Sequence, residues 1–229
     1  MLRFTMIFAG FFCCALALHA QTSGKPVPAE KPADRKGAPV APPSGKPQGV
    51  YATINIQPME EIRRRLESSS QRSGAAREVL KNPGAQMPPV LYALANVMSG
   101  DRPEESIFWY HVGRVRAVYD AFRCKDATAR NLIPELGKRL SPELIHSQFY
   151  QRERLVGISK KAIEWDAKNP RNYDQRWVCL SGRVAQTSAG TDPSEVQKPE
   201  SEWPAILKHI HEAHLLSVQE FAAQPPPNR

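Results

Sequence analysis

Apolar residues recur at helical spacing over most of the chain from about residue 50 onward. The clearest stretch is 89–123, where a short turn at 99–101 separates two apolar stripes. The first stripe is Val90, Leu91, Leu94, Ala95 and Met98, and the second is Phe108, Val112, Val115, Tyr119 and Phe122. Spacings of three and four residues are typical of a helix with one buried face. Because the connection is so short, the pattern predicts an antiparallel helical hairpin.

Further helices are predicted on both sides of this hairpin. They cover 59–66, 75–81, 126–140 with a break at Pro134, 141–168, and 202–221. Ser141 precedes a proline, which places a capping residue before the first turn of the long helix. Residues 51–57 alternate between apolar and polar and are expected to form an extended arm, and 182–199 a loop. The predicted fold is all-α, a compact bundle of about six helices over residues 50–223.

The hairpin also carries a recognisable set of residues. They are Leu94-Ala95, Gly100-Asp101, Glu105, Phe108-Trp109-Tyr110 and Gly113. This set resembles one unit of the tetratricopeptide or Sel1-like helical-hairpin repeats, and it is similar to uncharacterised exported bacterial proteins with a Trp-Tyr-x-x-Gly-x-x-Arg helix. The resemblance covers about 35 residues without a second copy, whereas solenoids stack several units. It implies a binding scaffold and no particular chemistry.

The N-terminal region predicts export. Residues 1–20 combine Arg3, an apolar run and small residues, which is the layout of a signal peptide cleaved after Ala17 or Ala20. The apolar run is shorter than the roughly 20 residues that span a bilayer, so no transmembrane segment is expected after cleavage. Residues 21–49 are rich in Pro, Ala, Gly and Lys, and predict a disordered tether, as 224–229 predict a disordered tail. A periplasmic or secreted location follows.

Two cysteines remain after signal cleavage, Cys124 and Cys179. In an oxidising compartment an even pair is interpreted first as a disulfide. Two buried free thiols are the alternative. Neither cysteine belongs to a Cys-x-x-Cys pair, so a redox or metal role is not predicted.

The chain is basic, with a formal net charge of +8 and an isoelectric point near 9.5. In an exported protein this balance favours an acidic partner or an anionic surface. The basic residues are spread out and no nucleic-acid-binding motif accompanies them, so nucleic acid is excluded as a partner. We expect a protein partner in the cell envelope, with an anionic envelope polymer as the other candidate.

Two polar clusters are candidate sites. His209, His211 and His214 fall one residue short of the His-Glu-x-x-His spacing, and only His211 and His214 share a helix face, so neither a metal nor a cofactor is predicted. The second cluster is Arg114, Arg116, Asp120 and Arg123. Its spacing fits a surface ladder of ion pairs, or alternatively an arginine clamp for a carboxylate or phosphate.

The predicted binding residues are Trp109, Arg116, Tyr173, Asp174 and Trp177. The last three lie in a short aromatic stretch outside the predicted helices, and Trp, Tyr and Arg are common energetic anchors of interfaces. If these residues bind a partner, an exposed patch around Trp109, Arg116 and Trp177 is expected. In the alternative interpretation, Tyr173 and Trp177 plug the end of the bundle and Asp174 caps a helix.

No catalytic residue is predicted. The chain lacks a Gly-x-Ser-x-Gly motif, and its scattered acids form no evident catalytic pair. The hypothesis is therefore a non-enzymatic helical binding protein of the bacterial envelope, which mediates a protein–protein or envelope-polymer interaction. The alternatives are an immunity protein that neutralises a toxin acting in the periplasm and a cell-wall hydrolase.

Overall fold

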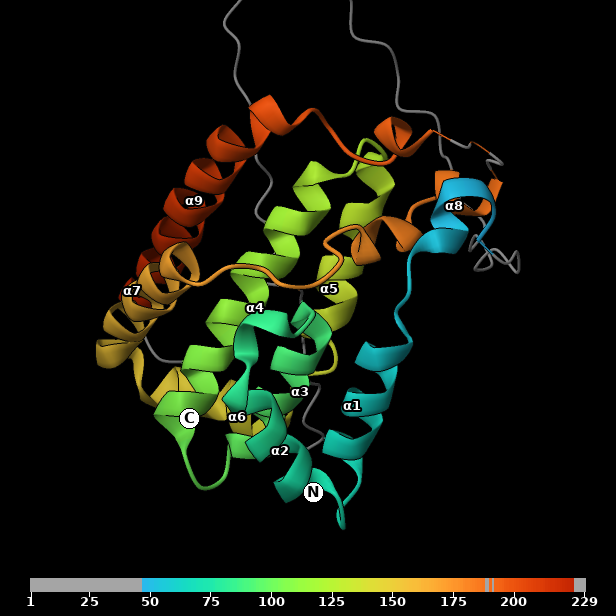
Figure 1. Cartoon of the computed structure of the whole chain (residues 1–229). Helices are drawn as coiled ribbons and strands as arrows, with labels where there is room; N and C mark the ends of the chain where they lie inside the picture. The colour runs from blue at the N-terminus through green and yellow to red at the C-terminus, as the bar shows by residue number, and fades with distance from the viewer. Residues whose placement is uncertain (1–46, 188–189, 191, 225–229) are drawn as a thin grey trace, which may run out of the picture. The chain divides into compact units, whose positions relative to one another are not determined.

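The computed structural model describes residues 47–187, 190 and 192–224. All regular elements within these residues are helices, and the only β-type pairing among them is an isolated bridge between Cys124 and Gln197 (Figure 1). The all-α prediction is therefore confirmed. The predicted signal peptide, nearly all of the tether and most of the tail lie outside the described residues. No described helix has the length and apolar character needed to cross a bilayer.

The described residues contain nine α-helices separated by short 3-10 helices. The α-helices are α1 (Gln57–Glu67), α2 (Arg72–Lys81), α3 (Pro88–Met98), α4 (Pro103–Arg123), α5 (Leu132–Gly137), α6 (Pro142–Tyr150), α7 (Arg152–Lys168), α8 (Val184–Thr187) and α9 (Trp203–Ala223). The 3-10 helices are η1 (Gly49–Thr53), η2 (Pro83–Ala85), η3 (Ala127–Asn131), η4 (Trp177–Ser181), η5 (Pro193–Glu195) and η6 (Glu200–Glu202).

The predicted hairpin is present as α3 and α4, which pack on each other more extensively than any other pair of helices. The buried hydroxyl of Ser106 donates to the carbonyl of Ala95 at 2.7 Å and ties the two helices together. Gly113 allows their close approach, because a Cβ atom there would lie 3.0 Å from a ring carbon of Tyr92 and 3.2 Å from Leu91 Cβ. The hairpin prediction is confirmed.

Helix α4 lies at the centre of the domain (Figure 1). It contacts α3 on one side and α7 and α9 on the other, while α1 packs on α3. Its apolar residues Ile107, Val112, Ala117 and Ala121 are fully buried. A helix surrounded on all sides has to bury polar residues too, and α4 buries several, including Arg116 and Asp120.

Three local predictions were wrong. Residues 49–53 form η1 rather than an extended arm, since Val50 and Tyr51 are buried in the core. The break in 126–140 falls between η3 and α5, ahead of Pro134, because a proline in the first turn of α5 needs no backbone donor. The predicted long helix over 141–168 is two helices, which separate at Gln151 with φ −106° and ψ 26°. These splits and the short α8 explain why more than six helices form.

The disulfide prediction is confirmed: Cys124 and Cys179 are bonded. The bond joins the end of α4 to η4, and both residues are buried, with 0% and 1% exposure. The alternative of two free thiols is therefore wrong. The bond holds Trp177 and its neighbours against the central helix.

Candidate functional site

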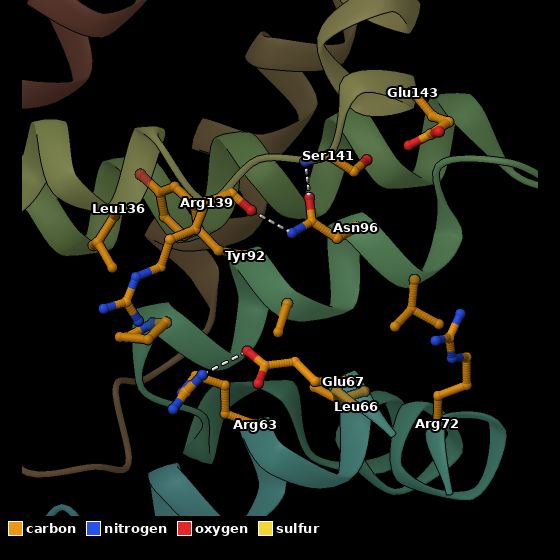
Figure 2. Close-up of a pocket in the computed structure, with 13 residues that line it drawn as sticks. Arg63, Leu66, Glu67, Arg72, Tyr92, Asn96, Leu136, Arg139, Ser141 and Glu143 are labelled. Atoms are coloured by element: carbon orange, nitrogen blue, oxygen red, sulfur yellow. Dashed lines mark hydrogen bonds and ion pairs between the residues drawn. The ribbon is translucent and has the colours of Figure 1, made fainter. Parts of the chain in front are cut away.

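A groove of about 290 Å³ lies between α1, α3 and the link that joins α5 to α6 (Figure 2). The apolar stripe of α1, Met59, Ile62 and Leu66, is buried. Arg63 and Glu67 each follow a member of that stripe by one position, so they lie at its edge and line the groove. The floor is apolar and is made by Leu66, Pro89, Ala93, Val97 and Leu136.

Asn96 of α3 makes two hydrogen bonds to the backbone of the link wall of the groove. Its amide oxygen accepts a hydrogen bond from the backbone N–H of Ser141 at 2.8 Å, and its amide nitrogen donates to the carbonyl of Arg139 at 2.8 Å. Figure 2 shows both bonds. The Ser141 hydroxyl also caps α6 by accepting from the backbone of Leu144, as the sequence predicts. The backbone from which the Arg139 side chain projects is thus held in place.

Three arginines and two glutamates line the groove. Arg63 is already paired with Glu60 at 2.6 Å and with Glu67 at 2.5 Å. By contrast, Arg72 and Arg139 are exposed and form no ion pair within the part of the chain that the structure describes. In Figure 2, Arg63 and Arg139 lie at one end of the groove and Arg72 at the other. The groove therefore offers unneutralised positive charge at both ends.

Arg116, which was predicted to bind a partner, instead pairs with Asp166 in the interior. One Asp166 oxygen accepts from Arg116 Nε at 2.8 Å, and the other accepts from His211 Nε2 at 2.9 Å and from Arg171. Burial on its own would raise the pKa of Asp166. The hydrogen bond from His211 and the charges of Arg171 and Arg116 outweigh that effect and hold the pKa below its usual value.

A second buried carboxyl, Asp120, gathers two of the predicted binding residues. Its Oδ2 accepts from Trp177 Nε1 at 2.8 Å and from the Tyr173 hydroxyl at 3.0 Å. Burial raises the pKa of Asp120 to about 7, although these hydrogen bonds act against the rise. The structure thus brings Tyr173 and Trp177 together, but around an internal acid and not around a ligand-binding surface.

The expected exposed patch around Trp109, Arg116 and Trp177 is wrong, since these residues are 8%, 0% and 4% exposed. The rings of Trp109 and Trp165 pack edge to face, with centroids 5.3 Å apart.

Asp174 is paired with Arg176 at 2.7 Å, next to η4. The packing of Trp177 and Tyr173 agrees better with the alternative in which they close the end of the bundle.

The surface ladder considered for Arg116, Asp120 and Arg123 is also wrong. All three residues are buried, and the side chain of each bonds to a side chain outside α4. Arg123 donates to Gln175 and stacks over the ring of Trp203, with 3.4 Å from its guanidinium carbon to the ring centroid. Arginines whose guanidinium groups are buried and engaged in this way are not free to clamp a ligand.

The histidines of α9 divide as the helix geometry predicts. His211 and His214 both face inward, while His209 is exposed. His214 Nε2 lies 3.0 Å from Nδ1 of His111 on α4, and both rings are buried. Burial lowers the pKa of His111 to about 3 and that of His214 well below the usual 6.5, so both rings are neutral at pH 7. Among the described residues, no three His, Cys, Asp or Glu side chains are grouped so that they could hold a metal ion.

This histidine pair predicts a loss of stability in acid. Because both pKa values are lowered, the contribution of the neutral rings is complete above the usual pKa of 6.5 and decreases as the pH falls below it. His111 alone is expected to lower the free energy of unfolding by about 2 kcal/mol between pH 6.5 and 4.5. Urea unfolding at several pH values measures this loss of unfolding free energy.

The contribution of Asp120 to the pH dependence of stability has to be eliminated before the histidines can be tested. Its raised pKa contributes stability that is complete below pH 3.8 and is lost as the pH rises through about 7, which opposes the histidines. The test is therefore made in an Asp120→Asn background. There, adding His111→Gln and His214→Gln should flatten the profile, whereas His209→Gln should not. An unchanged acid slope in the double glutamine variant would contradict the prediction.

The sequence prediction missed the groove arginines. Arg63, Arg72 and Arg139 belong to none of the residue clusters that the sequence indicates. One local feature points to the groove: Asn96 is a polar residue in the otherwise apolar α3. A polar side chain in such a helix usually hydrogen-bonds to a neighbouring element, and here that element is the link wall.

No family model, curated protein or solved structure matches this chain.

Proposed function

We propose that this protein is a non-enzymatic binding protein of the bacterial cell envelope, and that the groove between α1, α3 and the α5–α6 link holds part of a protein partner. The observation that carries the proposal is the position of Arg72 and Arg139 at opposite ends of a groove with an apolar floor. Guanidinium groups recognise carboxylates through paired hydrogen bonds, and arginine is a frequent energetic anchor of interfaces.

Binding is favoured over catalysis by the positions of the carboxyl and imidazole groups with strongly shifted pKa values. Of the strongly shifted groups among the described residues, only the Tyr92 phenol lines the groove, and burial raises its pKa, which makes it a weaker acid. An active site usually has ionisable groups with perturbed pKa values facing a pocket. Here Asp120, Asp166, His111 and His214 are buried and hydrogen-bonded to other side chains, and none of them lines the groove. They hold α4, α7, α9 and η4 together, which is a structural role.

Two further observations support a binding protein outside the cytoplasm. The buried disulfide is typical of proteins that fold in an oxidising compartment. The α3–α4 hairpin, with its resemblance to tetratricopeptide or Sel1-like units, is a common scaffold for binding peptides and proteins. An export signal and a tether at the N-terminus would place such a domain in the envelope.

The test is capture from crosslinked cell envelopes with a photo-reactive residue in place of Val97, on the groove floor. One stoichiometric protein partner is expected with the otherwise natural chain. The double variant Arg72→Glu/Arg139→Glu should recover at least tenfold less of it, because two positive anchors are replaced by repulsive charges. Both sites are exposed, so stability should change by only about 0.5 kcal/mol.

Arg64→Glu is the matched control. Arg64 lies on α1 next to Arg63, is largely exposed, pairs with Glu61 and does not line the groove. It should leave capture unchanged. Equal capture by the groove variant and the control would overturn the proposal, and recovery of glycan or lipid alone would favour an envelope polymer as the ligand.

A further inference from the structure

The groove presents carboxylates as well as arginines, and this mixture restricts the chemistry of what it holds. Glu67 uses one oxygen to pair with Arg63, and no hydrogen bond to its other oxygen is present among the described residues. Glu143, at the start of α6, makes no ion pair in the described structure. In Figure 2 it lies across the groove from Arg72. A ligand that enters here meets both donors and acceptors.

A polyanion would be a poor occupant of such a groove. A polyphosphate or a phosphate-rich polymer offers only acceptors, so it would gain from Arg72 and Arg139 but be repelled by Glu67 and Glu143. A peptide backbone carries an N–H and a C=O at nearly every residue. A peptide with acidic side chains can therefore satisfy both sets of groups at once.

The size and floor of the groove define the remaining features. A volume of about 290 Å³ lies at the lower end for ligand pockets, which suits a few residues of extended chain. Leu66, Ala93 and Val97 give the floor an apolar surface on which small apolar side chains can pack. The positive charges stand at the two ends, so the acidic groups of the ligand should stand apart.

We infer that the groove binds an extended peptide segment in which two carboxylates flank one to three small apolar residues. One carboxylate pairs with Arg139 and the other with Arg72, while backbone N–H groups of the segment donate to Glu67 and Glu143. This inference rests on the proposed function, because it specifies the part of the protein partner that enters the groove.

The probes are fluorescein-labelled peptides of the form Gly-Glu-(Ala)n-Glu-Gly with n from one to three, amidated at the C-terminus. Their matched controls carry glutamine in place of glutamate. Binding is measured by fluorescence anisotropy with the disulfide-bonded full chain. At one spacing the glutamate peptide should bind at least tenfold more tightly than its glutamine control. Arg72→Ala and Arg139→Ala should each weaken that binding about five- to tenfold, and Arg64→Ala should not.

Inorganic polyphosphate serves as the competing probe. It should displace the peptide poorly from the natural protein and markedly better from the variant Glu67→Gln/Glu143→Gln, which lacks the repelling carboxylates. The inference is overturned if glutamine and glutamate peptides bind alike, or if polyphosphate competes as well with the natural protein as with that variant.

The two proposals fail in different ways. If the peptides do not bind but capture of a protein still depends on Arg72 and Arg139, the acidic segment is wrong and the proposed function stands. If capture is also independent of both arginines, the groove is not the recognition site and both proposals fall.

Discussion

Replacing Asp166 with alanine is expected to lower the free energy of unfolding by about 4 kcal/mol, measured by urea denaturation at pH 7. Asp166 is the only carboxylate that pairs with Arg116 among the described residues, and both side chains are fully buried. Without it the Arg116 guanidinium keeps two backbone carbonyl partners but has no counter-charge. An uncompensated buried charge is costly because the low-dielectric interior solvates it poorly.

Asp166→Asn separates charge from packing. The amide fills the same space but leaves Arg116 and Arg171 without their negative partner, so most of the loss should remain. Asp174→Ala is the control for an ordinary ion pair, because Asp174 and Arg176 are partly exposed. It should cost less than about 1 kcal/mol. Similar losses for Asp166→Ala and Asp174→Ala would show that the buried network does not depend on Asp166.

Removing the disulfide is expected to have a comparable effect. Cys124 and Cys179 are 55 residues apart in sequence. For a closed loop of that length, the chain-entropy treatment gives a stabilisation of about 4 kcal/mol. The double variant Cys124→Ala/Cys179→Ala should therefore unfold at a correspondingly lower urea concentration. The bond also anchors η4, so Trp177 should lose its fixed contact with Asp120, which near-UV circular dichroism would detect.

The natural chain, unfolded, reduced and refolded in reductant, supplies the comparison for this variant. Its urea transition should coincide with that of the double alanine variant, because both lack the same constraint. Reduction of the native protein should be slow, since both cysteines are buried and a reductant reaches them only when the domain opens. A double variant within 1 kcal/mol of the oxidised protein would contradict the prediction.

The helices that could be predicted from sequence are those with a long local pattern. The hairpin of α3 and α4 and the final helix α9 were predicted within a few residues, because their apolar stripes and turn residues are adjacent in sequence. The break at Gln151 could not be predicted, because no glycine or proline marks it. Tertiary contacts flank the break: Phe149 packs against Phe221 of α9, and Arg152 lies over both rings.

The candidate site was harder to predict than the fold, and for a different reason. Whether Arg116 lies on the surface or in the core depends on Asp166, which is 50 residues away, and a single sequence does not show that the two meet. The groove presents the same difficulty, since Arg63 lies on α1, Arg72 on α2 and Arg139 in the link between α5 and α6. Only the disulfide was predictable over a long distance, because Cys124 and Cys179 are the two cysteines outside the predicted signal peptide and therefore leave one pairing.

The close approach at Gly113 determines which walls of the groove could be redesigned. Tyr92 packs against Gly113 and also lines the groove, so a larger residue at position 113 would disturb the groove from inside the domain. The α3 wall is thus tied to the core and tolerates little change. Arg139 and Glu143 are exposed, and Asn96 holds the backbone of Arg139 and Ser141, so new side chains at positions 139 and 143 would change the charge of the groove without repacking the protein.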